Sequence, residues 1–463
     1  MDASPPLLQP DRGQEAIAVH LIDKTGFANW AKQLSAGQRS ALAGQKFDGS
    51  ANQVGIVPDG DGWFAVGGVI NPAQLNSWCM AKLAEALPAG IYRLAGQQAG
   101  AALHGWQLGQ YRYDRYRQDD NSEGQRVLLT GDVARIDDAI AEAEAVCLVR
   151  DLVNAPAEDM GPAALEEQAE QLAKAHSAIL KTTRGDALKQ EYPMVHAVGR
   201  AAARHHAPRL MHLVWGQEEH PALAIVGKGV CFDSGGLDIK PASAMLLMKK
   251  DMGGAAHALA LAGLVMRSRL PVRLHLLIPA VENAISGNSF RPGDVLRSRQ
   301  GLTVEIGNTD AEGRLILADA LTRACEEKPD LLIDFATLTG AARVALGPDL
   351  PALMTRRDDT AAALAEGGLA SDDLVWRLPL HKPYGEWLKS PIADLNNAPA
   401  NGFAGASVAG LFLDRFVAED IDWAHFDTFA WRPDAKPGRP KGGDALGLRA
   451  AWHMLRARYP ASR

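Results

Sequence analysis

The feature that most constrains the fold of this chain is a series of short, almost uninterrupted apolar runs. These strand-like runs lie at 210–216, 222–230, 272–280, 302–308 and 331–338. Strands that are apolar on both faces require a covering layer on each face, which is typical of parallel sheets. The stretches at 252–267 and 315–327 have helical periodicity. The sequence therefore predicts an α/β fold whose mixed, largely parallel sheet is flanked by helices.

A smaller α/β unit is predicted before this sheet. Strand-like segments are found at 16–22, 63–69, 90–96 and 125–131, with a helical segment at 75–87. Longer helices are expected at 137–154 and 162–176, and a chain of 463 residues exceeds what one hydrophobic core usually serves. We therefore predict two domains, which are a small N-terminal α/β domain over residues 1–140 and a larger C-terminal domain over residues 141–463.

The charge balance gives no reason to expect nucleic acid or an anionic membrane as the main partner. The chain has 48 basic and 55 acidic residues, which leave a net charge of -7. The segment YRYDRYR at 111–117 combines arginine with tyrosine, as nucleic-acid surfaces do, but Asp114 interrupts it. We predict that this segment is the end of an amphipathic helix, and nucleic acid is an unfavoured partner.

The opening residues and the cysteines bear on where the protein resides. The first residues lack the basic and apolar segments of a signal peptide, and no apolar run is long enough to span a bilayer. The four cysteines, Cys79, Cys147, Cys231 and Cys325, form no CxxC pair, which predicts reduced thiols rather than disulfides. We therefore expect a cytoplasmic protein that does not enter the membrane.

Charged residues and glycines gather where the predicted strands of the C-terminal domain end. The seven charged residues concerned are Lys228, Asp233, Lys240, Asp251, Asp310, Glu312 and Arg314. Glycines flank them, as expected where backbone bends sharply or approaches a ligand closely. Since ligands collect at the carboxyl ends of strands in open α/β sheets, we expect these residues to meet in one site.

Separate structural roles are the alternative for these residues. Asp310 and Glu312 could cap a helix that begins near Arg314, and Asp233 before Ser-Gly-Gly could be an ordinary turn residue. The other charges could be solvated surface groups. Charge and glycine recur together at several strand ends, however, and this recurrence favours a shared site over several unrelated roles.

The chemistry of such a site follows from its carboxylates. Converging carboxylates repel one another and raise each other's pKa values unless cations lie between them. Oxygen-rich sites suit Mg²⁺ and Mn²⁺, while Zn²⁺ also accepts carboxylates. Three aspartates and a glutamate are too many for one catalytic zinc with an open position, but they suit two metals that share bridging carboxylates. The pattern therefore favours a two-metal site that activates water, and it does not decide which metals bind.

Four motifs of the C-terminal half are VGKGVCFDSGGLDIKP, MKKDMGGAA, NTDAEGRLILADAL and DFATLTGAA. In their order and intervals they resemble the core signatures of the leucyl (cytosol) aminopeptidase family, whose members are dinuclear metallopeptidases. The resemblance covers roughly residues 150–431, whereas residues 1–140 are similar only in general style to a macro-like N-terminal domain. It implies that residues 141–463 form a catalytic domain that releases N-terminal residues from peptides.

The resemblance also implies which residues bind metal. One metal would bind Lys228, Asp233, Asp251 and Glu312. The other would bind Asp233, Glu312, and both the side chain and the backbone carbonyl of Asp310, so that Asp233 and Glu312 bridge the two ions. Zn²⁺ or Mn²⁺ is expected first, with Mg²⁺ or Co²⁺ as alternatives. Lys228 would have to be neutral, and a nearby dication lowers the pKa of a lysine in that direction.

Two further residues, Lys240 and Arg314, correspond to the catalytic side chains of that family. The resemblance implies that a hydroxide held between the two metals attacks the first peptide bond and that Lys240 stabilises the oxyanion. It also implies that Arg314 holds a bicarbonate that serves as the general base. Members of the family form homohexamers, so the resemblance implies a homohexamer here.

Four residues are implied to line the pocket for the first side chain of the substrate, namely Met248, Thr337, Leu338 and Gly340. The resemblance predicts an apolar pocket suited to Leu or Met, with broad specificity because single methylenes discriminate weakly. Two departures mark a divergent branch of the family, since Phe429 takes the place of a small residue and Asp444 lies where Thr is common. We hypothesise that Phe429 reshapes the pocket.

Two other functions compete with the peptidase. The first is a DNA-binding or regulatory assembly, which some bacterial members of the family also form, but residues 1–140 contain no basic stripe. The second keeps two metals and changes the reaction to phosphoester or amide hydrolysis. Comparing phosphate esters with aminoacyl anilides as substrates separates this second function from the peptidase.

Overall fold

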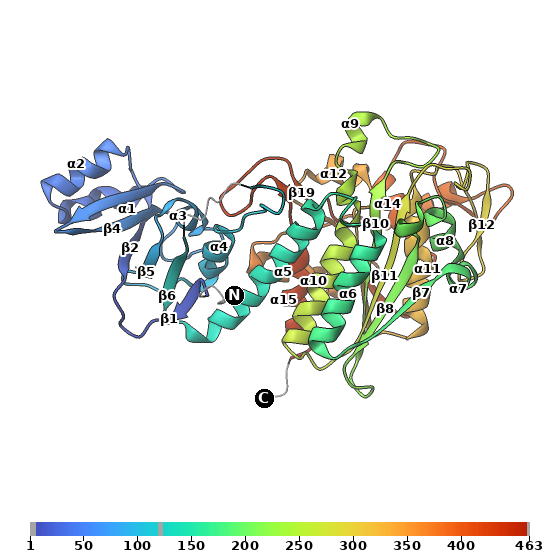
Figure 1. The fold of residues 1–463 in the computed structure, drawn as a ribbon, viewed down its shortest axis with the longest axis horizontal. Coiled ribbons are helices and arrows are strands. Elements are labelled where there is room, and N and C mark those ends of the chain that lie inside the picture. Colours follow the sequence, from blue (N-terminus) through green and yellow to red (C-terminus); the bar gives the residue numbers. More distant parts are fainter. Residues whose placement is uncertain (1–5, 119–123, 461–463) are drawn as a thin grey trace. The chain divides into compact units, whose positions relative to one another are not determined.

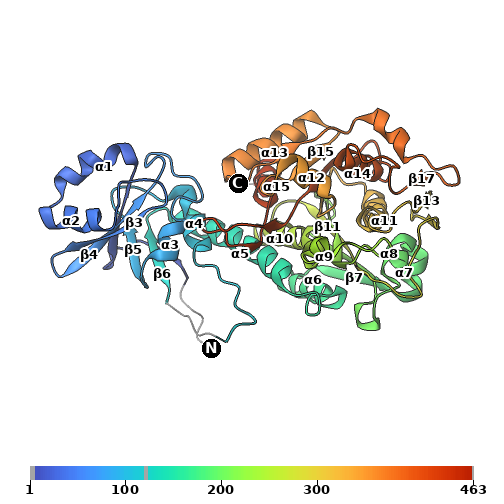
Figure 2. The same ribbon diagram turned by 90° about the horizontal axis from the view of Figure 1, so that it is seen from above.

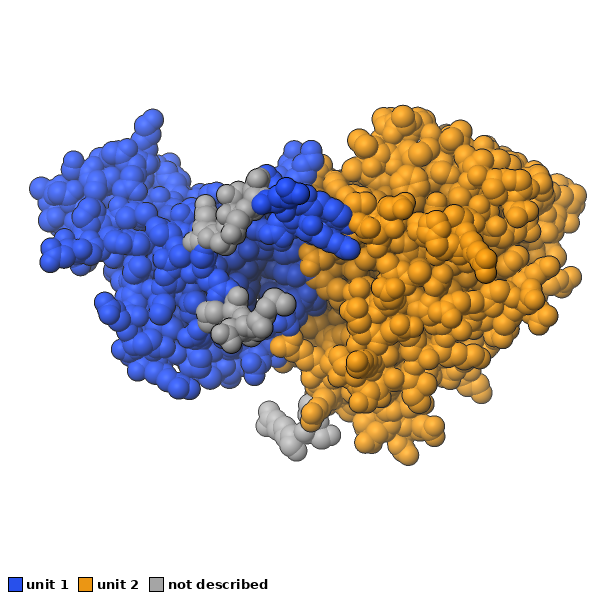
Figure 3. Space-filling view, in the orientation of Figure 1, with its two compact units in different colours: residues 1–147, 434–441 blue, residues 148–433, 442–463 orange. Residues whose placement is uncertain are grey.

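The computed structural model describes residues 6–118 and 124–460, and the chain divides into two compact units (Figure 3). Unit 1 contains residues 1–147 and 434–441, and unit 2 contains residues 148–433 and 442–463. Helix α5 (Ile136–Asn154) begins in unit 1 and ends in unit 2, and the predicted boundary after residue 140 lies within it. The prediction did not include the return of residues 434–441 to unit 1.

Unit 1 is built on a six-stranded sheet with the order β1-β6-β5-β2-β4-β3. Its strands are β1 (Leu8–Pro10), β2 (Ile17–Ile22), β3 (Val54–Asp59), β4 (Gly62–Gly68), β5 (Gly90–Leu94) and β6 (Arg126–Thr130). Only the β3–β4 pair is antiparallel. Four helices accompany the sheet, namely α1 (Lys24–Trp30), α2 (Ala36–Gly44), α3 (Ala81–Ala86) and α4 (Leu103–Leu108). The predicted strands of this unit are confirmed.

Two helix predictions in unit 1 were wrong in extent. The helix expected at 75–87 is confined to α3, because the Asn76 side chain accepts a hydrogen bond from the Trp78 N–H at 2.9 Å and holds a turn there. The segment at 111–117 is a loop with one turn rather than a helix end. Helix α4 stops before it, and the Gln110 side chain instead hydrogen-bonds both backbone groups of Arg126 at 2.9 Å.

Unit 2 contains a nine-stranded sheet with the order β16-β15-β18-β14-β9-β11-β8-β7, and β10 also pairs with β11. Its strands are β7 (Ile179–Arg184), β8 (Arg209–Trp215), β9 (Ala222–Gly227), β10 (Gly229–Asp233), β11 (Arg273–Asn283), β14 (Leu331–Ala336), β15 (Ala352–Thr355), β16 (Trp376–Arg377) and β18 (Asp422–Asp427). The central pairs are parallel, whereas the β11–β8, β8–β7 and β15–β18 pairs are antiparallel. The predicted mixed, largely parallel sheet is confirmed.

Helices cover both faces of this sheet (Figures 1 and 2). They are α6 (Pro162–His176), α7 (Gly185–Glu191), α8 (Pro193–Gly199), α9 (Ala242–Met245), α10 (Gly253–Arg267), α11 (Glu312–Glu326), α12 (Gly340–Leu346), α13 (Asp358–Ser371), α14 (Gly405–Asp414) and α15 (Leu448–Arg458). Helix α10 packs with α6 and α15, and α11 packs with α8 and α14. Strand β9 separates these layers, because Val226 belongs to the apolar core around α11 while Gly227 faces Ala255 of α10.

Two strand predictions in unit 2 need correction. The strand expected at 222–230 is broken at Lys228, where the chain leaves β9 and continues as β10 beside the far part of β11. The strand expected at 302–308 is only β13 (Thr303–Glu305), and it pairs with β12 (Val295–Arg297) and β17 (Leu395–Asn396) in a separate sheet. Within β13 only Val304 is buried, so this strand does not need covering on both faces. A last pair joins β19 (Trp431–Arg432) and β20 (Gly442–Gly443).

Candidate metal centre

The seven charged residues predicted to meet do line one cavity of about 560 Å³ in unit 2. Lys228 directly precedes β10 and Asp233 ends it, Asp251 lies two residues before α10, and Glu312 and Arg314 lie in the first turn of α11. Lys228 lies at the break between β9 and β10, and its side chain lines the cavity. The chain thus supplies the site from strand ends and from two helix starts.

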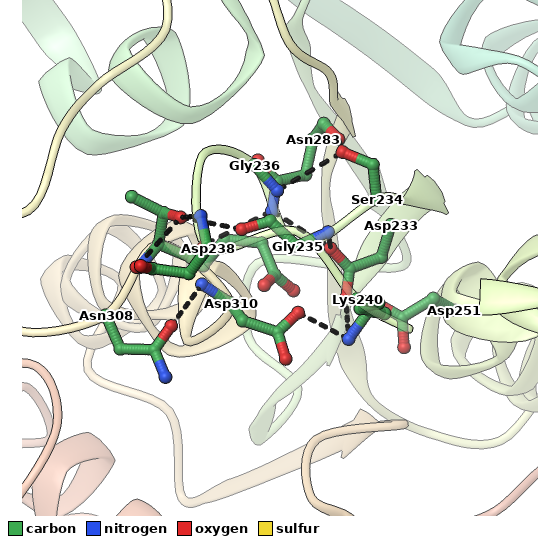
Figure 4. A network of polar contacts seen from close by, with 12 residues as sticks. Asp233, Ser234, Gly235, Gly236, Asp238, Lys240, Asp251, Asn283, Asn308 and Asp310 are labelled. Atoms are coloured by element: carbon green, nitrogen blue, oxygen red, sulfur yellow. Dashed lines mark hydrogen bonds and ion pairs between the residues drawn. The ribbon is translucent and has the colours of Figure 1, made fainter. Parts of the chain in front are cut away.

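Three carboxylates offer oxygen atoms that all lie within 4.8 Å of one another, and we call Asp233, Asp310 and Glu312 the carboxylate cluster. Two lysines form ion pairs with carboxylates of this cluster. Lys228 Nζ lies 2.7 Å from Asp251 Oδ2 and 3.1 Å from Glu312 Oε1. Lys240 Nζ lies 2.8 Å from Asp233 Oδ2 and forms an ion pair with Asp310 Oδ1 (Figure 4). Four carboxylates therefore share two ammonium groups.

The acid–base properties of the cluster reflect this shortage of positive charge. Burial and the charge of Asp233 raise the pKa of Glu312 to about 8 and the pKa of Asp310 to about 6. Burial alone would lower the pKa of Lys228, but the field of Asp251, Glu312 and Asp233 outweighs burial and raises it. A divalent cation would relieve this repulsion, so the residues present fit a metal.

Neighbouring amide and hydroxyl groups, which the sequence did not predict as part of the site, orient the cluster. Asn283, the last residue of β11, donates from Nδ2 to Asp233 Oδ1 at 2.9 Å and to the Thr309 carbonyl at 3.1 Å (Figure 4). Thr309 donates its hydroxyl proton to the Gly235 carbonyl at 2.6 Å. Asn397 binds the Asn308 backbone. Asn283 could have been predicted as a site residue, because it is a polar residue at the end of an apolar strand. No feature of the sequence around Asn397 indicates its role.

Two glycines allow other groups of the site to approach the backbone closely. A Cβ on Gly313 would lie 2.4 Å from Lys228 Cε, so a larger residue there would displace this lysine side chain from its position at the start of α11. Gly235 has φ +87, and a Cβ there would lie 2.5 Å from the Asp238 carbonyl oxygen. The glycines that flank the charged residues in the sequence are therefore required by the packing of the site.

The alternative structural roles are only partly supported. Helix α11 begins at Glu312, near Arg314 as expected, but its N-cap is Ala311 and no side chain caps its N-terminus, so the alternative capping role of Asp310 and Glu312 is not observed. The turn role of Asp233 is real, because its Oδ1 accepts a hydrogen bond from the Gly235 N–H at 2.9 Å. Its Oδ2 nevertheless faces the cavity and Lys240.

Arg314 lies beside the cluster as a buried cation. Its Nη1 donates to the Asn397 carbonyl at 2.6 Å, and its Cζ lies 6.0 Å from the centroid of the Phe412 ring. Among the residues the structure describes, no acceptor is paired with Arg314 Nε, although this atom is buried. Burial lowers the pKa of Arg314 to about 10. The guanidinium therefore has capacity for one more acceptor.

The predicted substrate residues line the same cavity, and we call Met248, Thr337, Leu338, Gly340 and Phe429 the first-residue pocket after the role predicted for them. Thr337 joins this pocket to the metal centre, because its hydroxyl donates to Asp251 Oδ1 at 2.8 Å and its carbonyl accepts from Lys228 Nζ at 3.2 Å.

Asp427, the last residue of β18, was not predicted from the sequence, and it holds the segment that forms this pocket. Its Oδ1 accepts from the Leu338 N–H at 2.9 Å and the Thr339 N–H at 3.1 Å, and its Oδ2 accepts from the Thr339 hydroxyl at 2.6 Å.

The other departure from the family pattern, Asp444, has a structural explanation. Arg150 Nε donates to Asp444 Oδ1 at 2.9 Å, and Arg432 Nε donates to Asp444 Oδ2 at 2.8 Å. All three side chains are buried, so each charge needs the others. Asp444 therefore ties the segment after β20 to α5 and does not line the cavity.

The sheet, the carboxylate cluster and the matches to known proteins define a metal-dependent hydrolase. A family model described as the catalytic domain of the cytosol aminopeptidase family matches residues 147–451, and one described as the M17 aminopeptidase N-terminal domain matches residues 17–129. The chain belongs to the cytosol aminopeptidase family, M17, whose members are metal-dependent exopeptidases.

Individual relatives agree with this assignment. A probable cytosol aminopeptidase of Leifsonia xyli is 39% identical over 90% of this chain and 91% of its own length. The crystal structure of the cytosol aminopeptidase from Coxiella burnetii is 44% identical, covers 98% of this chain and 99% of its own, and superposes with a TM-score of 0.92. The bottromycin maturation enzyme BotP in complex with Mn is 32% identical, with 96% and 99% covered and a TM-score of 0.86. These comparisons do not favour the DNA-binding alternative.

Proposed function

We propose that this chain is a two-metal aminopeptidase that releases the first residue of peptides. The observation that carries the proposal is the carboxylate cluster. Glu312 Oε2 is buried and has no hydrogen-bond partner among the described residues, and it belongs to a group of carboxylates at ligand spacing. The raised pKa values of Glu312 and Asp310 support the proposal, because a cation removes the repulsion that contributes to them.

Five side chains are proposed to hold the two metals, namely Lys228, Asp233, Asp251, Asp310 and Glu312. By the family resemblance, Asp233 and Glu312 would be shared by both cations; Asp233 lies beside Lys240 and Glu312 beside Lys228. When bound, the cations supply Lewis acidity that polarises the scissile carbonyl and lowers the pKa of water. Zn²⁺ and Mn²⁺ are the favoured ions, Mg²⁺ and Co²⁺ are alternatives, and the Mn complex of BotP supports Mn²⁺.

Lys240 and Arg314 are the proposed catalytic side chains. The Lys240 ammonium lies between Asp233 and Asp310, where it can donate a hydrogen bond to the carbonyl oxygen as negative charge develops on it. The unpaired Nε of Arg314 suits an anion, and we propose bicarbonate. Held there, bicarbonate would take a proton from water and return it to the leaving amine.

Specificity is proposed to have two parts. A free and uncharged α-amine is required near Lys228 and Asp251, so blocked peptides are not substrates. The first side chain enters the first-residue pocket, where Met248 and Leu338 offer apolar contacts and favour Leu or Met with broad tolerance. Phe429 fills part of the space that a small residue would leave open.

A homohexamer and a cytoplasmic location are also proposed. The homohexamer is proposed from the family resemblance, and the location from the names of relatives such as the probable cytosol aminopeptidase of Leifsonia xyli. Among residues 6–118 and 124–460, no helix has the length and apolar character needed to cross a membrane.

The proposal predicts activity that depends on metal and on the cluster. After chelation, unblocked leucyl and methionyl anilides should be hydrolysed only when Zn²⁺, Mn²⁺, Mg²⁺ or Co²⁺ is restored. Asp310→Ala and Glu312→Ala should each lower kcat/KM by at least about a thousandfold, because a ligand is lost. N-acetylated anilides and phosphate esters are the negative substrates. Inactivity with every metal, or faster hydrolysis of phosphate esters, would refute the proposal.

A further inference from the structure

A buried lysine, Lys250, lies beside the first-residue pocket, and its positive charge is only partly compensated by a nearby carboxylate. Lys250 lines the cavity beside Phe429, and the residue is 6% exposed. Its Nζ lies 5.2 Å from the centroid of the Phe429 ring. Among the described residues, its one ion-pair partner is Asp251 Oδ1 at 3.9 Å, which is beyond hydrogen-bond distance, and its ammonium makes no hydrogen bond.

Nearby carboxylates are committed to other groups. Asp251 accepts from Thr337 and pairs with Lys228, and it is a proposed metal ligand. Asp427 accepts three hydrogen bonds from Leu338 and Thr339. A buried ammonium without an acceptor is costly, and the face of an aromatic ring offsets only part of that cost. Lys250 can therefore gain an acceptor that a ligand brings into the cavity.

A second cation acts on the same ring. Arg343, an exposed residue of α12 that also lines the cavity, has its Cζ 4.9 Å from the Phe429 centroid. Phe429 is thus in contact with two cations, one buried and one exposed. A pocket lined by Met248, Thr337 and Leu338 alone would select by size and apolarity, whereas these two cations add a preference for charge.

We propose that Lys250, placed against Phe429, makes the first-residue pocket accept substrates whose first side chain carries a carboxylate and disfavour those with a basic first side chain. This inference rests on the proposed aminopeptidase function and specifies its substrate class. The first residue would be Glu or Asp in addition to Leu and Met. Lys250 is then a specificity-determining residue that contacts the substrate side chain and takes no part in bond cleavage.

The test compares kcat/KM for a panel of aminoacyl anilides with the metal-loaded full chain. The wild-type protein should hydrolyse the Glu substrate about tenfold faster than the Gln substrate of the same shape, because a charge-assisted hydrogen bond is stronger than a neutral one. Lysyl substrate should be slower than its uncharged counterpart of similar length, norleucyl substrate. This comparison needs no variant and is therefore independent of whether a variant folds.

Variants then assign the preference to Lys250. Lys250→Met should lower the Glu-to-Leu ratio of kcat/KM by about tenfold to a hundredfold, and it should raise the relative rate of the lysyl substrate. Lys250→Arg should retain the Glu preference because it keeps the charge. Lys249→Met is the matched control, since the Lys249 ammonium binds the Asn154 carbonyl at 2.5 Å and Lys249 does not line the cavity. It should leave both ratios unchanged.

The outcomes separate this inference from the proposed function. Hydrolysis of the Leu substrate with equal rates for Glu and Gln, or an unchanged Glu-to-Leu ratio in Lys250→Met, would overturn the role of Lys250 and leave the aminopeptidase intact. A Phe429→Ala variant that keeps the full Glu preference would show that the ring is not needed to place Lys250. Failure to hydrolyse any substrate with any metal would overturn the proposed function itself.

Discussion

Asp233 uses its two carboxylate oxygens for different purposes. Oδ1 accepts hydrogen bonds from the Gly235 N–H and from Asn283 Nδ2, both at 2.9 Å, and thereby fixes the turn after β10. Oδ2 faces Lys240 across the cavity at 2.8 Å. The turn role and the ligand role, which are alternatives in the sequence, are compatible in the structure because a carboxylate has enough lone pairs for both.

His257 is a buried residue whose protonation should set part of the acid stability. It lies within α10, where its Nε2 accepts from the Leu446 N–H at 3.0 Å, so Nδ1 carries the proton and donates to the Gly253 carbonyl at 2.7 Å. Burial lowers the pKa of His257 to about 4 from its ordinary 6.5. Between pH 6.5 and about pH 4, His257 is therefore protonated in the unfolded chain but neutral in the folded chain. The free energy of unfolding consequently decreases as the pH falls through this range.

This property predicts a pH effect that a single variant isolates. Moving the wild-type protein from pH 7 to pH 5 should cost about 2 kcal/mol of unfolding free energy through His257 alone. His257→Gln does not titrate there, so its loss over the same interval should be smaller by that amount. Chemical denaturation at both pH values measures the difference. Parallel losses in the two proteins would show that His257 does not make this contribution.

At the scale of elements, the first-residue pocket depends on the start of helix α12. Thr339 is the N-cap of this helix, since its hydroxyl oxygen accepts from the Ala342 N–H at 3.0 Å while its hydroxyl proton goes to Asp427 Oδ2. The same residue thus caps a helix and fastens it to β18. Leu338 and Gly340, which line the pocket, are its direct neighbours in the chain.

Removing this cap should loosen the pocket without touching the metal ligands. Thr339→Ala should destabilise α12 by about 1 kcal/mol, seen as faster amide hydrogen exchange in 340–346, and should raise KM for leucyl anilide more than it lowers kcat. Ser35→Ala is the matched control, because Ser35 caps α2 of unit 1 through the Gln38 N–H at 3.2 Å. It should speed exchange in α2 and leave KM unchanged. An unchanged KM in Thr339→Ala would contradict the role given to this anchor.

For the whole molecule, the placement of the metal centre predicts where metal binding stabilises the fold. All five proposed metal ligands belong to unit 2, which has its own apolar core around α11, while unit 1 has separate cores around Trp106 and Phe64. Metal at a hundred times its dissociation constant should stabilise the folded state by about 2.7 kcal/mol. Protection against hydrogen exchange should rise in α10 and α11.

Hydrogen exchange with and without chelator tests this placement. Strands β2 and β4 of unit 1 serve as an internal reference, because none of the proposed ligands lies there. Glu312→Ala is the control for specific binding, and it should lose most of the metal-dependent protection. Equal protection in the two units, or full protection in the variant, would argue against the proposed ligands.

Secondary structure within a segment could be predicted from the sequence, whereas pairing between segments far apart in the chain could not. Apolar runs and helical periodicity predicted the two α/β units, and α6 begins and ends where its pattern predicted. Periodicity did not predict the break at Lys228, because the residues on both sides are apolar and continue in strands. Nor did it place β13 outside the main sheet, since pairing partners lie far away in the chain.

The sequence by itself determined the chemical types at the site, namely carboxylates, lysines and an arginine that follow strands and are flanked by glycine. Only the tertiary structure decided that Asn283 and Asn397 support these groups and that Asp427 holds the pocket segment at Leu338, because those contacts join residues from separate elements. The same holds for Lys250, which the sequence presents as one of two adjacent lysines. The tertiary structure buries Lys250 against Phe429, so that its charge acts within the pocket and is not solvated at the surface.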